Sequence, residues 1–236
     1  NTVDPQSYID KYGADTVRLY MMFTAPPEQS LEWSESSVEG ASRFIKKVWN
    51  LVISRNYEDI NTPVNFSKEE LDLRRKTHTT LKKVTNDFET RFSFNTAIAS
   101  IMELLNAIPD DFKDKDASNS KKYCLNETII IILKTLNPIA PHVSEFLWNH
   151  FYNLNAPEEI ESSWPKVEDS LLEVSEFELV IQINGKVRGK TTARIEDTQN
   201  QIEEMAKKIE NVAINLDGKN IKKVIYIKGK IINFVI

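Results

Sequence analysis

The sequence predicts a mainly α-helical chain followed by a small α+β domain with the element order ββαββ. Apolar residues recur at helical spacing through roughly the first two thirds of the 236 residues. Beyond Glu178 this spacing gives way to alternation, which is typical of half-buried strands. Asn184-Gly185 separates two alternating runs, and it indicates a hairpin because both residues tolerate positive φ.

Two short helices are expected at the start of the chain. Asp4 with Pro5 favours a helix start, and Gly13 is placed to end that helix. Asp15 is expected to cap a second helix, from Thr16 to about Phe23, which Pro26-Pro27 ends. Its expected buried side consists of Val17, Tyr20 and Met21.

The stretch Leu31–Val52 predicts an amphipathic helix of at least four turns. One stripe at 100° per residue is apolar: Val38, Ala41, Ile45, Val48 and Val52. The opposite face is polar and largely basic: Arg43, Lys46, Lys47 and Asn50. Such a face is either a solvated helix surface or a phosphate-binding ridge, and periodicity does not choose between the two.

Residues 63–153 continue the helical pattern. Ser67 and Glu70 form a capping box for a helix running to about Phe92. Two further helices are expected over Phe94–Ile108 and Asn119–Leu136, and Pro141 begins the last one. Ile129–Leu133 is apolar nearly all round, so the helix that contains it should be the most buried.

The remaining sequence predicts a linker and then the α+β domain. Ala156–Leu172 is rich in Pro, Ser and acidic residues, with Trp164 as one anchor. Strands are expected at Glu178–Ile183, Lys186–Ile195, Ile221–Ile227 and Lys230–Val235. A helix is expected from the capping box at Thr198 to about Glu210.

Composition excludes several classes of protein. No apolar run is long enough for a membrane span, and one cysteine, Cys124, permits no internal disulfide. His78, His142 and His150 are scattered, so no metal-ligand spacing is present and no metal site is expected. The net charge is −5, but residues 174–236 alone carry +3, which places a basic region at that end.

Several motifs resemble one enzyme family. Tyr12-Gly13-Ala14-Asp15-Thr16-Val17-Arg18, then EWSESSVEGASRFIKKVW, then the PxAPHxxEFLW pattern at 138–148, resemble the region after the KMSKS loop in class I aminoacyl-tRNA synthetases of the leucine, isoleucine and valine group. The second of these motifs, together with QINGKVRGK and KKVIYIKGKIINFVI, is most similar to bacterial leucyl-tRNA synthetases. The resemblance covers essentially the whole chain and identifies it as a C-terminal fragment.

The resemblance implies a division into four parts. Residues 1–30 would be a stem-contact connector, 31–155 an anticodon-binding-type helical bundle, 156–174 a linker, and 175–236 a tRNA-binding α+β domain. The parent enzyme would join leucine to tRNA(Leu) using ATP and Mg²⁺ in the cytoplasm. The fragment would lack the catalytic and editing domains of its chain, hold no cofactor, act as a monomer and be inactive alone.

The expected site residues are cations that contact the tRNA sugar–phosphate backbone: Arg43, Lys46, Lys47, Lys186, Arg188, Lys190, Arg194, Lys222, Lys223, Lys228 and Lys230. Alternate strand positions would put the four from Lys186 to Arg194 on one face, and the last four would cluster near the second turn. The alternative is that strand lysines only protect exposed sheet edges. No catalytic residue is assigned, and Asp15, Arg18 and His142 are expected to be structural.

Three other interpretations stay open. The chain could be the same region of an isoleucyl- or valyl-tRNA synthetase, although the NGKVRGK hairpin favours leucine. It could also be a stand-alone RNA-binding module or a helical scaffold for protein interactions.

Overall fold

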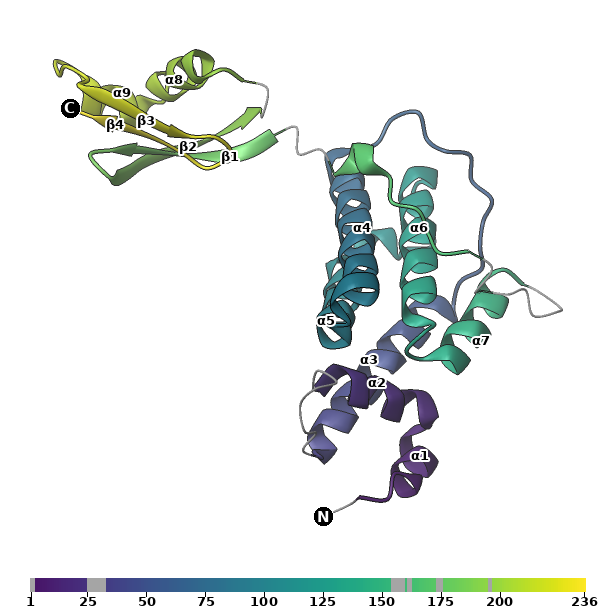
Figure 1. Cartoon of the computed structure of the whole chain (residues 1–236). Coiled ribbons are helices and arrows are strands. Elements are labelled where there is room, and N and C mark those ends of the chain that lie inside the picture. The colour runs from purple at the N-terminus through teal and green to yellow at the C-terminus, as the bar shows by residue number, and fades with distance from the viewer. Residues whose placement is uncertain (1–2, 25–32, 154–159, 161–162, 173–175, 195–196) are drawn as a thin grey trace. The chain divides into compact units, whose positions relative to one another are not determined.

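The computed structural model describes residues 3–24, 33–153, 160, 163–172, 176–194 and 197–236, which form two compact units (Figure 1). Unit 1 comprises Asn1–Leu172 and unit 2 comprises Glu173–Ile236. Unit 1 is helical, whereas unit 2 combines a four-stranded mixed sheet with two helices. This architecture confirms the predicted fold class.

Unit 1 is built from seven α-helices within the described residues. The α-helices are α1 (Gln6–Tyr12), α2 (Ala14–Thr24), α3 (Glu35–Val52), α4 (Lys68–Asn86), α5 (Phe94–Ala107), α6 (Asn119–Leu136) and α7 (Pro141–Phe151). The long irregular segment 53–67 connects α3 to α4. One π-helical turn and two 3₁₀ turns supplement them: η1 (Asp87–Arg91), η2 (Asp110–Phe112) and η3 (Asp169–Leu171).

Local sequence signals explain the starts of α4 and α7 and the end of α1. The side chain of Ser67 accepts a hydrogen bond from the backbone of Glu70, and the Glu70 carboxylate accepts one from the backbone of Ser67, as the capping box predicts. Gly13 ends α1 with φ +84°. Pro141 begins α7, where its missing N–H costs nothing.

Two predictions for the second helix are wrong. The second helix begins at Ala14, so Asp15 lies inside α2 and does not cap it. Instead, the Asp15 carboxylate accepts hydrogen bonds from His142 Nδ1 at 2.8 Å and from the backbone N–H of Val143 at 2.7 Å, which satisfies the N-terminus of α7. Met21 is 51% exposed and not buried as predicted. The long helix that begins at Lys68, by contrast, continues through the π-helical turn to Arg91, and Phe92 follows it in the left-handed conformation, so its predicted end at about Phe92 is confirmed.

The core of unit 1 lies between α2, α3, α4, α5, α6 and α7, and α2 contributes Leu19 and Tyr20 to it. On α3, Val38, Ala41, Val48 and Val52 are buried and Ile45 is partly buried, which confirms the predicted stripe. The helix was expected from Leu31, but it begins at Glu35 after an extended Ser34, so the predicted start is wrong, and Leu31 and Glu32 themselves lie outside the described residues. On α6, Ile129, Ile132 and Leu133 are at most 1% exposed, so α6 is a central helix as predicted.

The segment after α7 lies against the bundle where it is described. Trp164 Nε1 donates a hydrogen bond to Thr85 Oγ1 of α4 at 2.8 Å. The backbone N–H of Glu168 donates to His78 Nδ1 at 3.0 Å, and Asp169 pairs with Lys82 at 3.3 Å. Residues 163–172 are therefore fixed to α4 along their length.

The described part of unit 2 holds four strands and two helices: β1 (Glu176–Ile183), β2 (Lys186–Arg194), α8 (Gln199–Lys207), α9 (Glu210–Leu216), β3 (Lys223–Ile227) and β4 (Ile231–Val235). The strand order is β2-β1-β4-β3, with β1 and β4 parallel at the centre and an antiparallel hairpin on each side. Asn184 and Gly185 adopt φ +47° and +77°, which confirms the predicted tight hairpin turn.

The helical part of unit 2 differs from the prediction. A single helix to about Glu210 was expected, but α8 stops at Lys207 and α9 follows after a break at Ile209, whose backbone is extended. The Ile209 and Val212 side chains lie beside Gly189 of β2. Two short helices instead of one therefore cover the face of the sheet that carries Leu179 and Phe234.

Candidate nucleic-acid interface

Three of the predicted cations lie on the exposed side of α3. Because α3 buries its apolar stripe in the bundle, Arg43, Lys46 and Lys47 must face away from the core, and all three are exposed. Arg43 approaches Glu39 at 3.9 Å, one helical turn away, and this contact is well solvated. Lys47 Nζ donates to Asn106 Oδ1 of α5 at 3.4 Å. The positive charge of this face is therefore available to an external anion.

Arg43 and Lys47 line an open groove of about 710 Å³ between α2, α3 and α5. Its floor is apolar and includes Phe23, Phe44 and Met102, and none of the described residues that line it is acidic. Lys46 is not part of this lining, so the structure brings together two of the three predicted cations. A groove with cations on its wall and aromatic carbon on its floor suits a nucleic-acid backbone with its sugars.

The cations of β2 do not share one face. The prediction concerned four residues: Lys186, Arg188, Lys190 and Arg194. The pairing of β1 with β2 shifts between Ile181 and Gln182, which makes Arg188 the extra residue of a β-bulge. Side chains of residues directly opposed in a β-ladder point to the same face of the sheet. Lys186 is opposed to Ile183, whose side chain is in the core, so Lys186 lies on the face that the helices cover. Lys190 and Arg194 lie on the other face, so the prediction of a common face is wrong.

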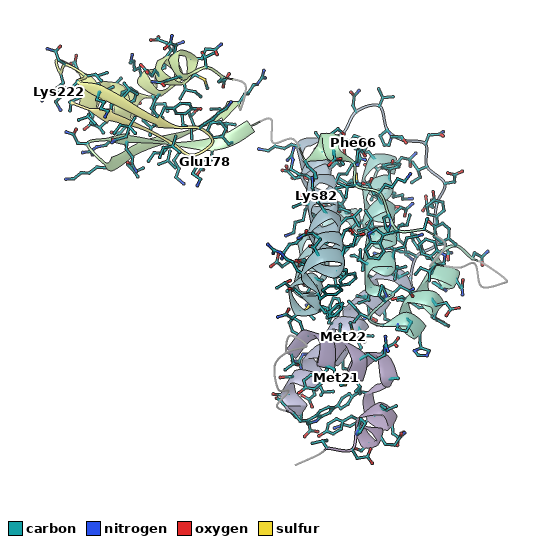
Figure 2. The ribbon with its side chains drawn as sticks, in the orientation of Figure 1. Met21, Met22, Phe66, Lys82, Glu178 and Lys222 are labelled. Carbon is teal, nitrogen blue, oxygen red and sulfur yellow. The ribbon has the colours of Figure 1, made fainter. Side chains whose placement is uncertain are left out.

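The four lysines around β3 are also divided. Lys222 and Lys223 lie where β3 begins, whereas Lys228 and Lys230 lie at the turn where it ends. At about 3.3 Å per residue, the two pairs are roughly 16 Å apart, so the predicted cluster near the turn is wrong. Figure 2 shows Lys222 toward one end of unit 2 and Glu178, the partner of Lys190 at 2.9 Å, toward the other.

The cations of unit 2 therefore gather at both ends of the sheet. One end carries Lys186, Lys222 and Lys223, because the β1–β2 turn and the start of β3 lie at the same end of the sheet, on either side of the end of β4. All the predicted cations of unit 2 are exposed except Arg188, which is half-buried. The face without helices presents Val187, Ile225 and Ile227, at 56%, 40% and 51% exposed. Unit 2 thus offers positive ends and an open apolar face.

A buried polar network occupies the bundle, and sequence reasoning missed it. Arg74 Nε and Nη2 donate to the two carboxylate oxygens of Glu127 at 2.8 and 3.0 Å, and Nη2 donates to Glu168 at 2.6 Å. His78 accepts from Glu168 at Nδ1, so its Nε2–H donates to Glu127 at 3.1 Å. Burial opposes the charge on Glu127, but hydrogen bonds from His78 and Arg74 hold its pKa below the usual value.

His78, Glu127 and Glu168 lie close enough together to suggest a metal site. The Arg74 guanidinium already supplies the positive charge between the two carboxylates, and both ring nitrogens of His78 have hydrogen-bond partners. These residues do not fit a metal ion and instead hold the 163–172 segment on α4.

Three side chains could by their chemistry take part in catalysis, but Arg18 and His142 make structural contacts and Cys124 is buried. Arg18 donates to the carbonyl groups of Ile139 and Pro138, and His142 is bonded to Asp15, as a structural role requires. Cys124 is fully buried, and burial raises the pKa of its thiol to about 12, so the thiol is not a nucleophile at neutral pH. Within the described residues, no helix has both the length and the apolar character needed to cross a bilayer.

Comparison with known proteins gives a consistent result. The profile of the anticodon-binding domain of tRNA ligase matches residues 70–213. Leucine–tRNA ligases of Marinobacter nauticus and Pseudoalteromonas atlantica are 43% and 44% identical to the chain over its whole length. The chain spans 27% of the length of each of these relatives.

A solved structure agrees with these relatives. The fold is similar to that of Agrobacterium radiobacter leucyl-tRNA synthetase, solved as a ternary complex with tRNA and LeuAMS, at a TM-score of 0.77 and 26% identity. The similarity covers 100% of this chain and 30% of that protein.

Proposed function

Because the chain belongs to the anticodon-binding domain family of tRNA ligases, as the C-terminal part of a bacterial leucyl-tRNA synthetase, we propose that it holds tRNA(Leu) by its sugar–phosphate backbone. A catalytic domain elsewhere in the parent enzyme would attach leucine to the tRNA with ATP and Mg²⁺, and an editing domain would complete the enzyme. The parent would act in the cytoplasm as a monomer. The chain itself would neither bind a cofactor nor catalyse a step.

The groove lined by Arg43 and Lys47 is the observation that carries this proposal. It combines two exposed cations with an apolar floor in a chain whose net charge is −5, so the local positive charge is not a consequence of average composition. Phosphate contacts of this kind fix the position of a nucleic acid without reading its bases. Such contacts suit a domain that positions a folded RNA.

The cations of unit 2 would supply a second set of contacts. Lys186, Lys222 and Lys223 share one end of the sheet, so we propose that this end meets the RNA backbone. Lys190 is paired with Glu178 and Arg188 is half-buried, so their contribution should be smaller. Lys46, Arg194, Lys228 and Lys230 remain proposed contacts.

A titration of labelled tRNA(Leu) with the whole 236-residue chain at several salt concentrations tests the proposal. The logarithm of the binding constant should fall steeply with the logarithm of salt concentration, by nearly one unit of slope for each phosphate contact. Arg43→Gln with Lys47→Gln should reduce both affinity and slope, whereas Lys82→Gln, an exposed lysine away from the groove, should change neither. Salt-independent binding, or equal losses in the control, would contradict the proposal.

A further pair of measurements addresses the enzyme. The parent enzyme carrying Arg43→Gln and Lys47→Gln should show a raised KM for tRNA(Leu) and unchanged leucine-dependent ATP–pyrophosphate exchange. The isolated chain should not charge tRNA at all. Faster charging of tRNA(Ile) or tRNA(Val) than of tRNA(Leu) by the parent would refute the leucine assignment.

A further inference from the structure

A second, smaller hollow lies beside the groove and was not anticipated from the sequence. It has a volume of about 380 Å³ and is formed by the second half of α3, the end of α5 and the residues after η2. Its polar lining residues are Lys47, Asn50, Arg55, Asn106 and Lys113, and Leu51 and Leu105 supply apolar surface. None of the described residues in this lining is acidic.

Arg55 is an unusual cation because its described hydrogen-bond partners are all neutral. Its guanidinium donates to the backbone carbonyls of Leu51 and Lys113, the latter at 2.8 Å, and to Ser54 Oγ at 3.0 Å. Among the residues that the structure describes, no carboxylate lies within ion-pair distance of it. Burial lowers the pKa of Arg55, which reflects the cost of holding this charge without a counter-ion. An external anion would remove that cost.

The other two cations of the hollow, Lys47 and Lys113, make only weak contacts with their partners in the protein. Lys113 Nζ pairs with Asp110 at 2.8 Å, but Asp110 is fully exposed, so an exchange for another anion costs little. Lys47 donates to the neutral amide oxygen of Asn106 at 3.4 Å, a long contact. Three cations and two amides therefore converge on one small volume.

The position of the hollow indicates which anion it takes. It shares Lys47 and Asn106 with the groove that contains Arg43. It also shares Arg55 and Lys113 with a hollow of about 430 Å³ whose lining adds Lys115 and Lys122. That lining also holds two acidic residues, Asp114 and Glu58, and Glu58 pairs with Lys122 at 3.1 Å. The groove and the smaller hollow, which meet at Lys47, suit successive phosphates of one chain better than one free phosphate ion, because a shared cation can bridge neighbouring phosphates.

We propose that the Arg55 hollow, defined by Lys47, Asn50, Arg55, Asn106 and Lys113, binds a backbone phosphate of the RNA that the neighbouring groove holds. This inference rests on the proposed function and extends the RNA path beyond α3 to the η2 region. Arg55 is a positioning as well as a binding residue, because it also joins the end of α3 to the backbone of Lys113.

Two variants of the whole chain test the hollow without touching Arg55. Lys113→Gln removes one cation, and Asn106→Asp places a carboxylate in the hollow with almost no change of shape. Each should weaken tRNA(Leu) binding by about tenfold and lower the salt slope by about one unit. Asn65→Asp makes the same charge change on an exposed loop residue and should leave affinity and slope as they are in the wild type. Equal circular dichroism spectra and melting temperatures establish that every variant is folded.

The outcomes separate the two proposals. Binding by the wild type with unchanged slopes in Lys113→Gln and Asn106→Asp would overturn the hollow and leave the function intact, whereas absence of salt-dependent binding by the wild type would overturn both. An equal loss in Asn65→Asp would mean that net charge and not the hollow is responsible. A ³¹P NMR titration with inorganic phosphate alone tests whether the hollow takes the free ion instead. Tight binding of phosphate that is lost in Asn106→Asp would identify a small-anion site and contradict the RNA assignment.

Discussion

Replacing Arg74 by methionine should destabilise unit 1 strongly, because it removes the cation from a buried polar network. Arg74 is 5% exposed and provides three short hydrogen bonds to Glu127 and Glu168. Its guanidinium also lies 4.7 Å from the centre of the Phe66 ring. Methionine fills most of the volume but leaves the Glu127 carboxylate in the interior with His78 as its remaining donor.

The expected loss follows from the exposure of the two partners. The Glu127 side chain is 16% exposed, so removal of its arginine leaves a largely buried charge, which costs about 3–5 kcal/mol. The Glu168 side chain is 46% exposed and becomes hydrated once Arg74 is gone, so the loss of this ion pair adds at most about 1 kcal/mol to the destabilisation. For a unit of this size, the sum corresponds to a decrease of about 10 °C in Tm.

Tryptophan fluorescence measures this loss selectively. The four tryptophans of the chain, Trp33, Trp49, Trp148 and Trp164, all belong to unit 1. Urea titration of wild type and Arg74→Met followed at this signal therefore reports the free energy of unfolding of unit 1 without a contribution from unit 2.

Arg75→Met is the matched control, because Arg75 is the next residue of α4 and pairs with Asp72 on the surface. It should cost less than about 1 kcal/mol. The double variant Arg74→Met with Glu127→Gln should recover at least about 1 kcal/mol relative to Arg74→Met, since no buried charge is left. A loss below about 1 kcal/mol in Arg74→Met, or no recovery in the double variant, would refute the reasoning.

Three further predictions concern acid stability and unit 2. Burial opposes the charge on Glu70, but hydrogen bonds from Ser120 and Ser67 hold its pKa below the usual value. The ionised carboxylate therefore stabilises the folded state above the unfolded-state pKa of about 4.3, and this stabilisation is lost as the pH falls through the lower pKa of the folded state. Glu70→Gln should therefore flatten the decrease in unfolding free energy between about pH 4.5 and 3, and an unchanged decrease would count against this. Gly185→Val should lower the free energy of unfolding by about 1–2 kcal/mol, because the backbone at this position has a φ of +77°. Amide hydrogen exchange in β1 and β2 should become faster, and unaltered exchange would contradict the turn assignment. Gly189→Val should cost about 1–3 kcal/mol by the same measurement, because a Cβ there would lie 3.3 Å from Ile209 Cγ2, and a stabilised variant would show that α9 can move away.

The sequence predicted what depends on neighbours along the chain. The capping box at Ser67, the helix start at Pro141 and the Asn184-Gly185 turn each need only a few adjacent residues. The apolar stripe of α3 needs only helical spacing, and it correctly placed Arg43, Lys46 and Lys47 on the exposed side.

What the sequence did not predict depends on residues far apart. Glu127 and Glu168 are 53 and 94 positions from Arg74, so no local pattern reveals their network. Asp15 looks like a helix cap in sequence, but it satisfies the start of α7 instead. The bulge at Arg188 turns Lys186 to the opposite face, and the spacing of lysines alone does not indicate a bulge.

The hollow around Arg55 illustrates the same limit. Lys47, Asn106 and Lys113 come from three separate elements, and only the packed bundle brings them together. Arg55 follows the end of α3, where the helical pattern has stopped, so periodicity assigns it to no face.

The parallel pairing of β1 with β4 has a consequence for how unit 2 acquires its structure. Each hairpin can form from contiguous residues, but a two-stranded hairpin is at best marginally stable in water. The two hairpins join only when Val180 meets Ile231, after closure of a loop of roughly 50 residues that contains α8 and α9. The sheet should therefore appear in one late, cooperative step whose rate is set by that closure, and deletion of Ile231–Val235 would remove a strand from the middle of the sheet and abolish the whole unit.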